Sequence, residues 1–334
     1  MNRHKTLIAT AAGAGALSLA LALMPTAQAD PPAGTYRALA GGGSDTTQTL
    51  MNAVADIVTV DGAKVLASYD AIGTEKVTTK DPATNPACKD IVRPNGSTAG
   101  RDALQNSLLA KDNCWQWARS SSSKSTYTSS VSMAWVPFAT DALTFAVRSD
   151  GDVPTQLTKA EIVSIFKCDN DAYQPALVQV GSGTRNSWLD YVGIPRDFTP
   201  SQYPCLVPEK DGGTFPGNLP QEHDGRELKN NQIMPYSAAV YQAQLWKSAP
   251  DRRGMAVIGV IDGVAPTVLN TEFSGLRNVN NIVPSALADD STSLIYKVFV
   301  GVNSEVCKAK PTINLQGFGD LKDKSKCGDT SSRS

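Results

Sequence analysis

Histidine is almost missing from this sequence: there are two, His4 and His223, among 334 residues. His4 lies in a segment that we expect to be cleaved, so the mature chain would contain one histidine. Histidine is the commonest metal ligand in proteins and a frequent general base. Its scarcity argues against histidine-rich metal sites and metallohydrolases, and we expect no bound metal, no cofactor and no enzymatic activity.

A surplus of charge of either sign is also missing. The chain has 31 Lys and Arg against 32 Asp and Glu, and the expected cleavage removes two basic residues and no acidic ones, which leaves a net charge of −3. A general nucleic-acid-binding protein carries a basic surplus, so nucleic acid is not expected as a partner. The 41% of apolar and 19% of charged residues are typical of a globular protein. The length corresponds to about two domains.

Long apolar runs are confined to the start of the chain. A basic start is followed by an apolar stretch from Leu7 to Met24 and by Ala27-Gln28-Ala29, a small-residue cleavage motif. This order predicts a secretory signal peptide over 1–29, cleaved before Asp30. A membrane anchor is the alternative, but glycines dilute the stretch, and it is short for a spanning helix of about 20 residues. No cysteine stands near the cleavage site to carry a lipid, so we expect a secreted, soluble monomer.

All six cysteines follow the expected cleavage site. An even number of cysteines in an exported chain predicts three disulfide bonds. We predict that neighbours along the chain pair, as Cys88–Cys114, Cys168–Cys205 and Cys307–Cys327. The alternative is a metal site, but the sequence contains no C-x-x-C spacing.

Short apolar segments alternate with segments of helical periodicity. The expected strands are 65–69, 133–138, 143–147, 176–180, 255–261 and 295–302, and the expected helices are 48–58, 103–110, 159–166, 186–192 and 237–247. The apolar runs at 255–261 and 295–302 are continuous, as is typical of strands buried on both faces. The alternation of strands and helices predicts an α/β protein with mostly parallel central sheets.

Three segments combine glycine with small hydroxyl residues at the expected start of a helix. They are Gly41-Gly42-Gly43-Ser44-Asp45-Thr46-Thr47, Asn95-Gly96-Ser97-Thr98-Ala99-Gly100 and Gly181-Ser182-Gly183-Thr184-Arg185. The first backbone N–H groups of a helix lack internal partners and the helix dipole favours anions there, so such segments can hold an oxyanion. The alternative for each one is an ordinary helix cap. The spacings match no nucleophile elbow, no complete dinucleotide fingerprint and no Walker A sequence.

The order of these segments resembles the phosphate-binding proteins of ABC phosphate importers, in the type-2 periplasmic-binding-protein superfamily, and especially secreted, disulfide-containing Gram-positive members. The resemblance also rests on five further segments, which are Ser68–Gly73, Trp117–Ser121, Val136–Ala139, Leu157–Phe166 and Pro235–Ser237. It implies a two-lobed fold with a hinge cleft, with lobe 1 formed by 30–139 and 255–334 and lobe 2 by 140–254. It further implies inorganic phosphate or a related tetrahedral oxyanion as ligand and an ABC permease as partner.

The resemblance also implies the ligand-binding residues and shows where this chain departs from the family. The residues carried over are Ser44, Asp45 and Thr46 in the first segment, Ser97 and Thr98 in the second, and Ser182, Gly183 and Thr184 in the third. The family's proton-accepting aspartate aligns with Ser121, and its binding arginine aligns with Val178. We therefore expect Asp45 to replace the acceptor and Arg185 to replace the arginine.

Other interpretations remain open beside this one. The chain could be a cell-surface protein with a vestigial or different-ligand pocket, or a secreted hydrolase of phosphate esters on the same scaffold. The sequence Glu222-His223-Asp224 follows a Gly- and Pro-rich stretch; it could supply a general base or a ligand contact, but a solvated loop is favoured. Trp115, Trp117 and Trp135 are interpreted as core residues.

Overall fold

The computed structural model describes residues 30–124, 127–206 and 220–334, so the predicted signal peptide lies outside the described residues. A mixed sheet runs through the molecule in the order β10-β11-β8-β14-β7-β1-β4, with β12 paired to β8. Its strands are β10 (Gln174–Pro175), β11 (Gln232–Ser237), β8 (Met133–Arg148), β14 (Leu276–Pro284), β7 (Trp117–Ser120), β1 (Leu39–Gly43), β4 (Leu66–Ser68) and β12 (Ala256–Ile258).

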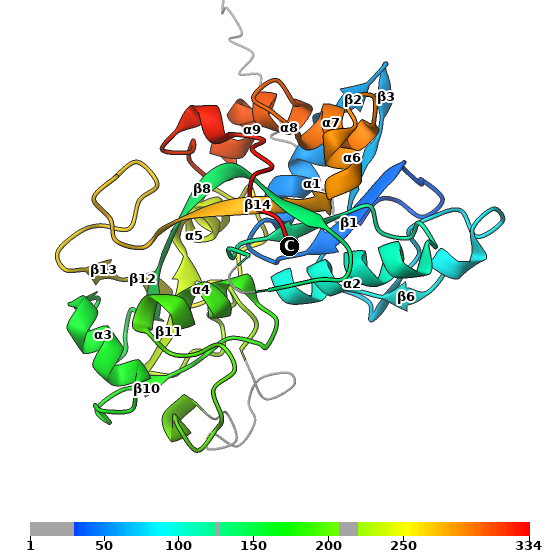
Figure 1. The fold of residues 1–334 in the computed structure, drawn as a ribbon. Coiled ribbons are helices and arrows are strands. Elements are labelled where there is room, and N and C mark those ends of the chain that lie inside the picture. Colours follow the sequence, from blue (N-terminus) through cyan, green and yellow to red (C-terminus); the bar gives the residue numbers. More distant parts are fainter. Residues whose placement is uncertain (1–29, 125–126, 207–219) are drawn as a thin grey trace, which may run out of the picture.

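Strands pair in parallel toward both ends of this sheet, as β10 with β11 and as β7, β1 and β4. The long strands β8 and β14 pair antiparallel with each other and with their outer neighbours in the middle. Figure 1 shows them passing between a group of elements around α1 and α2 and a group around α3, α4 and α5. The α/β class predicted from the sequence is therefore confirmed.

The five predicted helices are present as α1 to α5, whereas the four helices after β14 were not predicted. The helices are α1 (Gln48–Ile57), α2 (Ser97–Ala110), α3 (Lys159–Phe166), α4 (Gly183–Val192), α5 (Ala238–Leu245), α6 (Ser285–Asp289), α7 (Leu294–Phe299), α8 (Glu305–Lys308) and α9 (Lys310–Leu315). The strand predicted over 295–302 is wrong, because this segment forms α7. Ser293 caps that helix, and its apolar residues lie on one helical face, a pattern that a continuous apolar run hides.

The strands also differ from the sequence prediction. Strands β1, β7 and β14 were not predicted, and the continuous strand expected over 255–261 is divided into β12 and β13 (Val260–Ile261), which pair with different strands. The segments 133–138 and 143–147 belong to one 16-residue strand, β8, which continues through Asp141. The strand expected over 176–180 is found instead at Gln174–Pro175. Short two-residue strands complete the set, namely β2 (Thr59–Val60), β3 (Ala63–Lys64), β5 (Lys76–Val77), β6 (Ile91–Val92), β9 (Gln156–Leu157) and β13 (Val260–Ile261).

Two large apolar clusters lie in the two parts of the molecule that β8 and β14 connect. One contains Trp117, the first half of β8 and the helices after β14. The other contains the second half of β8, Trp188, and also Ile261 and Phe273. Trp115, Trp117 and Trp135 are all buried, which confirms their interpretation as core residues. In the part of the chain that the structure describes, no helix combines the length and apolarity needed to span a bilayer.

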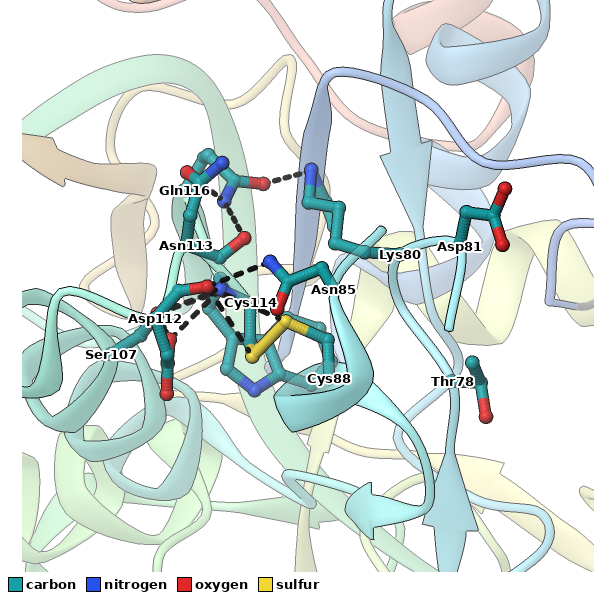
Figure 2. The surroundings of a disulfide bond; sticks show 12 residues. Thr78, Lys80, Asp81, Asn85, Cys88, Ser107, Asp112, Asn113, Cys114 and Gln116 are labelled. Atoms are coloured by element: carbon teal, nitrogen blue, oxygen red, sulfur yellow. Dashed lines mark hydrogen bonds between the residues drawn. A yellow bond between two sulfur atoms is a disulfide. The ribbon is translucent and has the colours of Figure 1, made fainter. Parts of the chain in front are cut away.

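The three predicted disulfide pairs are confirmed, as Cys88–Cys114, Cys168–Cys205 and Cys307–Cys327. Figure 2 shows the first of them, which joins a short 3-10 turn (Pro86–Cys88) to the segment after α2. Beside it, Asn85 donates a hydrogen bond of 2.8 Å to the Asp112 carbonyl oxygen, and the Cys114 N–H donates one of 3.0 Å to Ser107 Oγ. Both sulfurs lie in an apolar cluster with Leu104 and Trp115.

Replacing Cys88 and Cys114 together by alanine is expected to lower the free energy of unfolding by about 3 kcal/mol. The bond closes a loop across a sequence separation of 26 residues, so its loss frees the unfolded chain. Denaturant unfolding of the oxidised wild type and of the double variant measures the difference. Equal unfolding free energies would contradict a stabilising role for this bond.

Candidate functional site

The three glycine- and hydroxyl-rich segments meet through their backbones. Gly96 donates its N–H to the Gly43 carbonyl oxygen at 3.2 Å, and Thr98 donates to the Gly181 carbonyl oxygen at 3.0 Å. Gly96 has a φ of 110°, and a Cβ there would lie 2.5 Å from the Gly181 carbonyl oxygen. Only glycine therefore allows this approach, which brings the N-termini of α2 and α4 to one place.

Six hydroxyl side chains gather where these segments meet, and we name them the hydroxyl cluster. Its members are Ser44, Thr46, Ser97, Ser121, Ser182 and Thr184, and each is at most 2% exposed. Thr46 Oγ1 lies 2.9 Å from Ser121 Oγ and 3.1 Å from Thr184 Oγ1. Ser44 Oγ lies 3.0 Å from Ser121 Oγ. The structure thus brings together residues of all three segments and Ser121.

Three other predicted site residues border the cluster or contact residues beside it. A Cβ on Gly183 would lie 2.2 Å from Ser97 Oγ, so its backbone touches the cluster. Thr98 Oγ1 accepts a hydrogen bond of 3.3 Å from Asn186. The Asp45 carboxylate contacts His223 Nδ1 at 3.0 Å and Gln221 Nε2 at 3.4 Å. The Asp45 carboxylate thus contacts His223 and Gln221, and not a hydroxyl of the cluster.

Arg185 does not reach the cluster. Its Nη1 donates to the Val178 carbonyl oxygen at 2.9 Å, and its guanidinium lies 5.6 Å from the centre of the Phe198 ring. Burial lowers the pKa of Arg185 to about 10, so it keeps its charge at neutral pH. The Arg185 guanidinium therefore binds a backbone carbonyl oxygen of the segment before α4 instead of a hydroxyl of the cluster.

Arg277, and not Arg185, is the arginine whose guanidinium contacts the hydroxyl cluster. Its Nη2 donates to Thr184 Oγ1 at 3.0 Å, and its Nε and Nη2 bind Asp141 Oδ2 at 2.9 and 2.8 Å. Arg277 and Asp141 are paired residues across β14 and β8. Arg277 was not predicted as a site residue, because asparagines interrupt the apolar pattern of β14 and hide it as a strand in the sequence.

Glu222 is a second charged residue at the cluster, and the sequence offered it as a ligand contact only as the less favoured alternative. The solvated loop favoured for Glu222-His223-Asp224 is wrong for its first two residues, which are 0% and 1% exposed. Glu222 Oε2 accepts a hydrogen bond of 2.8 Å from Ser182 Oγ and lies 3.4 Å from Thr46 Oγ1. A carboxylate thus touches the hydroxyl cluster, but it comes from Glu222 and not from Asp45.

A cavity of about 430 Å³ borders the cluster. Ser121 and Arg277 belong to its lining, together with Ser187 and Asn280. The hydroxyl cluster therefore adjoins a space large enough for a small ligand. Elsewhere in the described ranges, one group of side chains lies close enough together to hold a metal ion, namely Cys88, Asp112 and Cys114. The two sulfurs of this group form a disulfide bond with each other and are therefore not free to bind a metal.

The fold resembles solved structures of phosphate-binding proteins. An ABC-type phosphate transport receptor from Vibrio cholerae has a TM-score of 0.50 and 17% identity, over 85% of this chain and 100% of the other. A human phosphate-binding apolipoprotein has a TM-score of 0.50 and 12% identity, over 86% of this chain and 92% of the other. No protein-family model matches the sequence, and no curated protein matches it. The chain therefore has the mixed α/β fold of these solute-binding proteins, as the sequence resemblance implied.

Proposed function

We propose that this chain is a secreted solute-binding protein that holds phosphate, or a similar tetrahedral oxyanion, at the hydroxyl cluster for ABC-type uptake. The observation that carries the proposal is the convergence of buried hydroxyls from three chain segments beside Arg277. The relatives in fold that bind phosphate support the same ligand class.

The chemistry of the cluster suits a desolvated anion. A buried anion is costly unless hydrogen-bond donors replace its water. Hydroxyls supply neutral donors, the N-termini of α2 and α4 supply backbone N–H groups and a favourable dipole, and Arg277 supplies positive charge. Oxyanions bind such sites without any bond being made or broken, so the protein acts as a receptor and not as an enzyme.

The proposal includes two lobes joined by β8 and β14. Ile261 and Phe273 pack with the cluster that contains Trp188, so we assign the chain up to about Leu276 to the second lobe. The chain would then return from the second lobe to the first at the start of β14. The resemblance had placed this return at residue 255. The oxyanion would be held where the lobes meet, by a monomer that delivers it to a permease.

One observation favours a second candidate, a surface protein whose pocket is vestigial. The Glu222 carboxylate already occupies donors of the hydroxyl cluster. A pocket filled by the protein itself in this way could have lost its external ligand. Titration of the protein with oxyanions separates the two candidates.

The test is calorimetry on the chain from Asp30, stripped of bound anion, with phosphate and then sulfate at neutral pH. We expect saturable phosphate binding, and we expect Thr46→Val to weaken it by about tenfold because one hydroxyl donor is lost. Thr47→Val is the matched control: Thr47 is equally buried, and its hydroxyl has no hydrogen-bond partner in the described structure.

Two results would reject the proposal. If neither phosphate nor sulfate gives a heat of binding, the surface protein with a vestigial pocket is favoured. Release of phosphate from a chromogenic phosphate ester, lost in Thr46→Val, would instead indicate a hydrolase.

A further inference from the structure

The Glu222 carboxylate is fully buried at the centre of the candidate site. Its Oε2 accepts a hydrogen bond of 2.8 Å from Ser182 Oγ, and its Oε1 has no hydrogen-bond partner in the described structure. Ser182 is also the N-cap of α4, so the carboxylate lies at the positive end of that helix. Glu222 therefore uses the features that suit an external oxyanion.

The backbone around Glu222 holds the side chain in this place. Its N–H donates to Gln179 Oε1 at 2.8 Å. The next residue, His223, has a φ of 60°, a conformation that costs a non-glycine residue about 1–2 kcal/mol in general. Its carbonyl oxygen accepts hydrogen bonds from Tyr236 Oη at 2.7 Å and Gln244 Nε2 at 2.9 Å. The inward position of Glu222 is thus stabilised by neighbours on both sides.

The hydroxyls themselves leave no space among them for a tetrahedral anion. Thr46 Oγ1 lies within hydrogen-bond distance of both Ser121 Oγ and Thr184 Oγ1. Groups that donate to opposite sides of one anion must lie farther apart than groups that bond to each other. An external oxyanion can enter only if these hydroxyls separate and the carboxylate leaves Ser182.

We propose that Glu222 is an internal ligand of the oxyanion site, which an external oxyanion must displace in order to bind. The inference rests on the proposed function. It makes the Glu222 carboxylate a competitor that lowers the affinity for any tetrahedral oxyanion. The opposite role, an acceptor for the proton of hydrogen phosphate, would place carboxylate and ligand side by side and raise the affinity for phosphate alone.

Calorimetry with Glu222→Gln distinguishes these roles, because glutamine keeps the size of the side chain and removes its charge. We expect Glu222→Gln to bind phosphate and sulfate each about ten- to a hundredfold more tightly than wild type, by removal of charge-assisted hydrogen bonds that compete with the ligand. Glu227→Gln is the matched control, since Glu227 lies in the same segment and is exposed. We expect it to leave both affinities unchanged.

Each other outcome overturns the inference in a recognisable way. Weaker phosphate binding with unchanged sulfate binding would make Glu222 a proton acceptor. Equal affinities of wild type and Glu222→Gln would show that the carboxylate does not compete. If Glu222→Gln misfolds by circular dichroism, Glu222→Ala replaces it with the same expectation. Absence of binding in wild type and variant alike would reject the oxyanion function itself.

Discussion

Replacing Arg277 by alanine is expected to weaken phosphate binding by about a hundredfold, since truncating a buried, hydrogen-bonded charge in an interface costs about 2–5 kcal/mol. Arg277 Nη2 donates to Thr184 Oγ1, inside the hydroxyl cluster, and its side chain is 10% exposed. Calorimetry with phosphate measures the loss. Arg185→Ala is the control and should leave the affinity unchanged, because its guanidinium binds the Val178 carbonyl oxygen instead.

Arg277→Ala also leaves the Asp141 carboxylate without its cation, and that side chain is fully buried. Loss of one partner of a buried ion pair lowers stability by about 3–5 kcal/mol. The double variant Arg277→Ala, Asp141→Asn removes the uncompensated charge and should recover part of the stability without recovering the affinity. Wild-type phosphate affinity in either variant would show that Arg277 has no role in binding.

Replacing Gly183 by alanine is the second change that is expected to weaken phosphate binding strongly. A Cβ at this first residue of α4 would lie 2.2 Å from Ser97 Oγ and 2.4 Å from Ser121 Oγ, closer than atoms can approach. The methyl group therefore pushes α4 away from the hydroxyls of the other segments. Overpacking of this kind costs about 1–3 kcal/mol, and we expect the phosphate affinity to fall by about ten- to a hundredfold.

Gly151→Ala is the matched control for crowding without a role in binding. A Cβ at Gly151 would lie 2.5 Å from the Asn230 carbonyl oxygen, in the turn that follows β8. We expect both variants to unfold at lower denaturant concentration and only Gly183→Ala to bind phosphate more weakly. Equal affinities of the two variants would argue against a binding site at the start of α4.

Local patterns were sufficient for the parts of the site that lie within single segments. The third segment was predicted to lie at the start of a helix, with capping as the alternative to anion binding, and Ser182 caps α4. The second segment, which contains Gly96, was predicted to precede a helix, and α2 begins at Ser97. These properties follow from one residue and its immediate neighbours, so a sequence shows them directly.

The two charged groups of the site could not be predicted in the same way. Arg185 lies next to the third segment, yet its side chain turns toward Val178, whereas Arg277 reaches Thr184 from 93 residues away. The sequence also favoured a solvated loop at Glu222, because the loop rich in glycine and proline before it is typical of exposed chain. Its burial depends on Gln179, Tyr236 and Gln244, which belong to other segments.

The α/β class, the three disulfide pairs and the helix starts at the three segments could be predicted from the sequence, because they depend on local patterns and on a small number of cysteines. Which cation and which carboxylate contact the hydroxyls depends on the packing of segments that are far apart in the sequence. Long side chains such as those of arginine and glutamate reach several ångströms from their backbone, so the packing of distant strands and loops, and not their neighbours in sequence, selects their partners.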